Sequence, residues 1–241
     1  MNLAPVLRAE ALKVLTLRSL CGTLAALFAA TTAFSALAGV SDTSDPDFDP
    51  LFTALSGVMP GQIAAVAFGA VVLSSEYQGN GIRLTLAAVP QRGRWFTAKL
   101  AVVAVPALGV GLATALAALL AARAGLGTAA DALTVGEQVR GVVGCGIYLM
   151  LMALFAAGLT ALFRSGVATL STLIPFILIV SFVIGDAAGT AADFLPDKAG
   201  QAILHQTHEG TLGPWTGLAV TALWAAAALL AGFWRLRRRD A

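Results

Sequence analysis

Six long intervals without a charged residue constrain this chain more than any other feature. A helix rises 1.5 Å per residue, so about 20 apolar residues cross a hydrocarbon core of about 30 Å. A soluble chain of 241 residues has no interior large enough to bury six such helices. The sequence therefore predicts an all-α membrane protein, a single domain over residues 1–241, with six transmembrane helices. The predicted spans are about 19–41, 51–75, 100–122, 141–163, 166–185 and 213–234.

The positive charges set the expected orientation. If the N-terminus lies in the cytoplasm, twelve of the fifteen Lys and Arg residues fall on the cytoplasmic side. Short cytoplasmic loops are enriched in these residues, so we expect both termini to be cytoplasmic. Segment 76–99 then forms a cytoplasmic loop, and segment 186–212 is extracytoplasmic. The net charge of +2 does not indicate a nucleic-acid partner.

The chain lacks the residue patterns that drive chemistry inside a membrane. It has no Gly-x-x-x-x-Gly-Lys-Ser/Thr loop to cradle the phosphates of ATP. No Asp, Glu, Lys, Arg or His lies within the predicted spans, whereas ion-coupled transporters and intramembrane enzymes keep such groups at membrane depth. We therefore expect no catalytic, cofactor-binding or metal-binding residue, and a protein that is not an enzyme on its own. The energy for its work would arrive from outside the bilayer.

The lead segment 1–18 has the composition of an interfacial helix. Its apolar residues fall mainly on one side of a helical wheel and its basic residues mainly on the other, as in helices that lie in the membrane surface. The alternative is an ordinary positively charged flank. The charged residues of this predicted helix are Arg8, Glu10, Lys13 and Arg18.

Segment 76–99 has internal structure that a simple connection does not need. Gly79-Asn80-Gly81 predicts a turn, residues 82–89 fit about two helical turns, and Pro90 ends them. A short apolar helix between turns suits the groove of a partner protein. The alternative is a solvated basic loop.

These features together resemble a known family. The lead segment 7–19 resembles the Glu-x-x-Lys-x-x-(Thr)-x-Arg-Ser start of actinobacterial permease subunits of type-2 ATP-binding-cassette (ABC) exporters, including multidrug and antibiotic exporters. Segment 75–99 resembles their Ser-Glu-Tyr…Gly-(Thr)-Ile-Arg…Pro…Arg…Lys pattern, with Asn80-Gly81 where Gly-Thr is more usual. The resemblance covers essentially the whole chain, although each motif is short.

The resemblance implies a multi-pass permease of the bacterial inner membrane. It would pair with a second permease protomer, identical or related, and with a separate ATPase subunit that binds ATP and Mg²⁺. It would export a lipophilic or amphipathic substrate such as a drug, antibiotic, peptide or lipid, in contact with membrane lipids and without nucleic acid. The residues that match the family's ATPase-coupling loop are Glu76, Tyr77, Arg83, Pro90, Arg92, Arg94 and Lys99.

Glu76 would end the second span and hold contacts to the loop or the lead helix, and the basic residues would meet the ATPase or lipid phosphates. Two other functions stay open on the sequence alone. One is a membrane interaction or resistance subunit that transports nothing, and the other is an ion-coupled secondary transporter.

Overall fold

The computed structural model describes residues 3–40, 48–78, 81–88, 91–181, 183, 189–207 and 210–238. Helices form all of the regular structure in these ranges, which contain no strand. Within the described ranges, five helical segments are long and apolar enough to cross a membrane, which supports a multi-pass all-α membrane protein. They are α2 (Arg18–Ala38), α3 and α4 together (Pro50–Leu55 and Val58–Ser74), α6 (Arg92–Leu126), α7 (Val135–Phe163) and α11 (Pro214–Arg238).

The fifth predicted span, 166–185, is occupied by a shorter apolar helix. Helix α8 (Gly166–Pro175) continues as a π-helical stretch, Phe176–Val180. A proline inside a helix removes a backbone N–H donor and its ring crowds the preceding turn. Pro175 is the last residue of α8, directly before the π-helical stretch begins. The apolar helix Gly166–Ile179 is too short to count with the five long segments, so the total of six spans stays a prediction.

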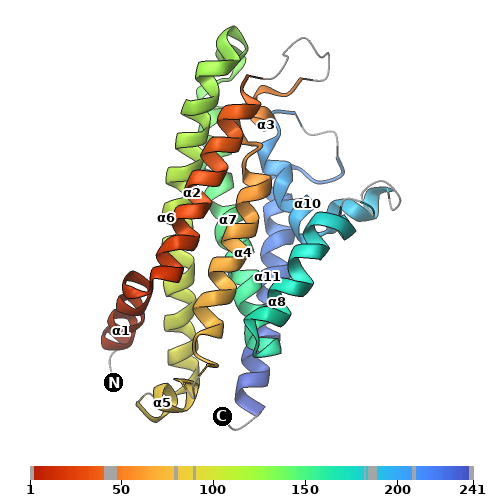
Figure 1. Ribbon diagram of the computed structural model, residues 1–241. Helices are drawn as coiled ribbons and strands as arrows, with labels where there is room; N and C mark the ends of the chain where they lie inside the picture. The colour runs from red at the N-terminus through yellow and green to blue at the C-terminus, as the bar shows by residue number, and fades with distance from the viewer. Residues whose placement is uncertain are drawn as a thin grey trace.

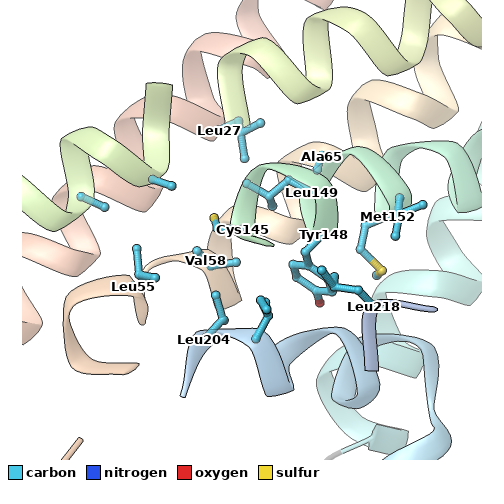
Figure 2. Close-up of a cluster of buried hydrophobic side chains, with 14 of the residues drawn as sticks. Leu27, Leu55, Val58, Ala65, Cys145, Tyr148, Leu149, Met152, Leu204 and Leu218 are labelled. Carbon is cyan, nitrogen blue, oxygen red and sulfur yellow. The ribbon is translucent and has the colours of Figure 1, made fainter. Parts of the chain in front are cut away.

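Helix α7 occupies the centre of the bundle. It packs against α4, α6 and α11, which surround it along its length (Figure 1). Tyr148, Leu149 and Met152 of α7 form the middle of a buried apolar cluster (Figure 2). Leu27 of α2 and Leu218 of α11 belong to the same cluster, so helices distant in the sequence share one core.

Glycines let these helices approach closely. A Cβ atom on Gly69 of α4 would lie 1.9 Å from the carbonyl oxygen of Ala153 in α7. A Cβ on Gly158 of α7 would lie 2.6 Å from the backbone nitrogen of Leu229 in α11. In a membrane, where lipid is as apolar as a side chain, such small-residue contacts provide much of the helix association.

The predicted extracytoplasmic segment folds back onto the bundle. Its described part contains η3 (Gly189–Phe194), α10 (Pro196–Gln201) and η4 (Ala202–Leu204). Helix α10 packs on α11, and η4 contacts both α7 and α11 (Figure 1). Most of α10 is therefore buried rather than exposed on a loop.

The lead helix α1 (Leu3–Thr16), the short helix α5 (Gly81–Ala88) and the last turns of α11 gather at one end of the bundle, here called the α5 end (Figure 1). Helix α5 lies where the sequence predicts a short helix. The following helix, α6, begins at Arg92 rather than near residue 100, so residues 92–99 form its first two turns instead of loop.

Candidate functional site

Four charged side chains from three separate segments meet at the α5 end. Lys99 Nζ donates to Glu10 Oε2 at 2.5 Å and to Glu76 Oε1 at 2.7 Å. Lys13 Nζ donates to Glu10 Oε1 at 3.0 Å and to the same Glu76 Oε1 at 2.8 Å. Each lysine thus bridges both carboxylates. We call these four residues the ion-pair cluster.

Local structure places each member of the cluster. Glu10 and Lys13 are three residues apart on α1, a spacing that puts them on one face of the helix. Lys99 lies two turns into α6, which packs against α1. Glu76 follows the end of α4, where its backbone N–H still donates to the Leu73 carbonyl at 3.2 Å. The cluster therefore ties α1, the end of α4 and the start of α6 together.

Glu76 also holds helix α5. Its second carboxylate oxygen accepts a hydrogen bond from Thr85 Oγ1 of α5 at 3.0 Å. Its carbonyl oxygen accepts from the backbone N–H of Ile82, in the first turn of α5, at 2.7 Å. Side chain and backbone of one residue thus fix two turns of α5 to the bundle.

Burial makes these interactions strong and also makes them interdependent. The side chains of Glu10, Glu76 and Lys99 are at most 5% exposed, whereas that of Lys13 is 41% exposed. Val14, Leu20, Ile82, Trp95 and Phe96 form an apolar cluster at the same end of the bundle. Charges removed from water require partners, and two carboxylates here face two ammonium groups.

The electrostatics keep Glu76 and Lys13 charged. Burial by itself would raise the pKa of Glu76, but the charge of Lys99 and the hydrogen bonds from both lysines hold it below its usual range. Burial would likewise lower the pKa of Lys13, but its hydrogen bonds to Glu76 and Glu10 raise it. The Glu76 carboxylate, held in this way, is a structural partner and is poorly suited to exchange protons with a substrate.

Four of the eleven residues singled out from the sequence form the cluster, and the others lie elsewhere. Arg8 and Arg18 are exposed on α1 and at the start of α2. Arg92 Nη1 donates to the Leu236 carbonyl of α11 at 2.7 Å, and Arg94 is exposed beside an apolar cleft. Tyr77 is half-buried. Burial raises its pKa, although the positive charges of Arg164 and Arg235 oppose that shift. The side chain of Arg83 and the whole of Pro90 lie outside the described residues.

Sequence reasoning missed Thr85, whose role depends on where α5 packs. It also missed a third buried carboxyl group, that of Asp197 in α10, which is 2% exposed. Ser181 Oγ donates to Asp197 Oδ1 at 2.8 Å. Burial raises the pKa of Asp197, although the hydrogen bond from Ser181 opposes that shift. The sequence places this residue in an outside segment, and only the folding back of α10 buries it.

Another buried polar contact lies deeper in the bundle, where Tyr148 of α7 donates a hydrogen bond to the side-chain oxygen of Gln62 in α4. This contact joins two of the central helices.

In the part of the chain that the structure describes, no three His, Cys, Asp or Glu side chains are grouped to hold a metal ion. Comparison with models of known protein families and with curated proteins finds no match.

Proposed function

We propose that this chain is the membrane-spanning permease subunit of an ATP-driven ABC exporter, with α5 as the helix that receives the motion of a separate ATPase. The observation that carries the proposal is the position of Glu76. Its two carboxylate oxygens link α5, through Thr85, to α1 and α6, through Lys13 and Lys99. A force applied to α5 would therefore reach the ends of three other helices.

In this mechanism the ATPase docks on the cytoplasmic α5 end. Its closure on ATP pushes α5, and the ion-pair cluster makes α1, the end of α4 and the start of α6 move with it. The close packing of α7 against α4, α6 and α11 carries the displacement into the bundle. Packed helices of this kind shift between discrete arrangements rather than deform continuously, as alternating access requires.

The proposal includes the partners that the resemblance implies. A second permease protomer, identical or related, completes the pathway, and the ATPase subunit binds ATP and Mg²⁺. The spans are almost free of ionisable side chains, which favours a lipophilic or amphipathic substrate moved out across the bacterial inner membrane.

The test begins with purification of the tagged protein from its own host in mild detergent, and mass spectrometry of what accompanies it. We expect a stoichiometric ATPase. Recovery of intact, well-solubilised protein without any ATPase would contradict the proposal and favour an interaction subunit that transports nothing.

Thr85→Val then tests the coupling role in the purified complex. Losing one partly buried hydrogen bond to a charged group is expected to lower ATP hydrolysis by the reconstituted complex about tenfold while the ATPase stays bound. The control is Thr172→Val, because Thr172 is exposed on α8 and its hydroxyl donates to the Ala168 carbonyl one turn earlier on the same helix. Equal rates of ATP hydrolysis in the two variants would mean that Thr85 has no part in coupling α5 to the ATPase.

The buried carboxyl group of Asp197 favours one second candidate, ion-coupled transport, because a carboxyl group shielded from water is a common carrier of protons. Proteoliposomes that contain this chain alone distinguish the two functions. Substrate movement driven by an imposed proton gradient, and lost in Asp197→Asn, would favour the second candidate, whereas a requirement for ATP and the ATPase favours the first.

A further inference from the structure

An apolar cleft of about 520 Å³ opens between the start of α6 and the end of α11. Phe96 and Leu100 line it from α6, and Leu229 and Phe233 line it from α11. This volume is within the range of about 300–1,000 Å³ found for sites that bind small molecules. The cleft is distinct from the ion-pair cluster, and its use does not depend on whether the chain is a transporter.

The cleft begins where the two helices are held together. The hydrogen bond from Arg92 to the Leu236 carbonyl joins α6 and α11 at the α5 end of the bundle. From Gly93 to Leu100 the helix rises about 10 Å, so the cleft is about two thirds as long as one leaflet of a hydrocarbon core about 30 Å thick. Its α11 wall, Leu229 to Phe233, belongs to a helix that is long and apolar enough to cross a membrane.

Basic side chains stand at the α5 end of this cleft. Arg94 is one of its lining residues. The guanidinium carbon of Arg237 lies 5.8 Å from the centre of the Phe233 ring, which itself stacks on Phe96 at 5.4 Å. Arg238 lies 4.2 Å above the ring of Trp234, the neighbouring residue of α11. The apolar walls therefore end in a positively charged rim.

We propose that this cleft binds one anionic phospholipid of the leaflet at the α5 end, with an acyl chain along its apolar walls and the phosphate at its rim. The charge of the rim selects an anionic headgroup over a zwitterionic one. Each basic residue near an anionic headgroup contributes about fivefold in affinity, so two arginines are expected to give at least tenfold selectivity.

Native mass spectrometry of the delipidated protein tests this proposal by titration with phosphatidylglycerol or with phosphatidylcholine of the same chain length. We expect one phosphatidylglycerol retained per protomer, at least tenfold more tightly than phosphatidylcholine. Arg94→Gln and Arg237→Gln should each lower phosphatidylglycerol binding about fivefold and leave phosphatidylcholine unchanged. Arg123→Gln, at the other end of α6, is the matched control and should change neither lipid.

Gly93→Leu tests the cleft itself. A Cβ atom at Gly93 meets only Phe233, at 3.8 Å, so the new side chain enters the cleft without disturbing the backbone. It should lower the binding of both lipids at least tenfold. The control is Gly109→Leu on the same helix, where a Cβ has nothing within 4 Å.

Three results would overturn the proposal. The first is equal affinity for the two lipids, and the second is unchanged binding in Gly93→Leu. The third is a dimer that Gly93→Leu disrupts and phosphatidylglycerol does not displace, because the cleft would then be occupied by a second copy of this chain.

Discussion

The carboxylate of Glu76 uses its two oxygens to hold different parts of the chain, and its neighbours depend on it in turn. Replacing such a cluster as a whole by apolar residues is often tolerated, whereas removing one member leaves a buried charge without its partner. The cluster should therefore respond to single substitutions far more strongly than to paired ones.

Lys99→Met is the sharpest single test of the cluster. It leaves the buried carboxylate of Glu10 with only Lys13, and we expect a loss of about 3–5 kcal/mol in the free energy of unfolding. For a chain of this size that corresponds to a fall in Tm of about 10 °C in detergent.

The matched control for that test is Arg123→Met, since Arg123 is exposed near the far end of the same helix. The double variant Glu10→Leu/Lys99→Met keeps the pair of Lys13 with Glu76 and should recover part of the lost Tm. A double variant whose loss equals the sum of the two single losses would argue against a coupled cluster.

Asp197 should give the protein a pH dependence opposite to that of Glu76. Its raised pKa means that the folded state holds the proton at pH values where the unfolded chain has released it. The free energy of unfolding therefore falls as the pH rises from about 3.8 through the raised pKa. Glu76, with a lowered pKa, contributes stability that is lost instead as the pH falls through that pKa.

Tm measured from about pH 4 to about pH 7 checks this expectation. Asp197→Asn should lose the part of the slope that declines with rising pH, because an amide cannot ionise. Asp131→Asn, an exposed position, provides the comparison. A slope unchanged in Asp197→Asn would mean that its carboxyl group titrates as it does in water.

At the scale of elements, helix contacts in this bundle depend on positions where no side chain fits. Gly69→Ala and Gly158→Ala would each push a methyl group into the backbone of a neighbouring helix. We expect a loss of about 1–3 kcal/mol for each. Gly109→Ala, with open space around it, should instead stabilise α6 by up to about 1 kcal/mol.

Thermal unfolding followed by circular dichroism in one detergent measures all three glycine variants. If Gly69→Ala were as stable as Gly109→Ala, the contact between α4 and α7 would be looser than the structure has it.

The sequence predicts the apolar helices well because a lipid environment leaves few alternatives for a long uncharged segment. It is less informative about where they start and break. No charge marks the break between α3 and α4, where the Gly57 N–H donates to Ser35 Oγ of α2. Arg92 and Lys99 look like loop residues by charge alone, yet α6 includes both because each finds its partners in other helices.

The sequence predicts only part of the candidate site. The family-like motifs drew attention to Glu10, Lys13, Glu76 and Lys99, but not to how they pair, because the pairing depends on the packing of α1 against α6. The sequence does not predict that Asp197 is buried. Its burial follows from the return of α10 to the bundle, and no local pattern reports a contact of that kind.

At the scale of the whole molecule, the distribution of Lys and Arg predicts which end of the bundle faces the cytoplasm. Gln78, at the α5 end, and Val135, at the start of α7, are both exposed. In a variant with Cys21→Ser and Cys145→Ala, a single cysteine introduced at either position reports its side of the membrane.

A maleimide that cannot cross membranes should label Val135→Cys in intact cells and Gln78→Cys only after the cells are opened. Labelling of both positions from outside would contradict the predicted topology. The reverse pattern would invert the protein, and with it the leaflet in which the apolar cleft lies.

The ion-pair cluster also sets an order of events during synthesis. Glu10 and Lys99 are 89 residues apart, so a ribosome adding about 5–20 residues per second produces the second partner roughly 4–18 s after the first. Throughout that interval α1 lacks its buried partner on α6. A truncated product ending before Lys99 would leave Glu10 and Glu76 to share Lys13 as their one partner in the cluster, so the contact between α1 and α6 forms only after Lys99 has been added.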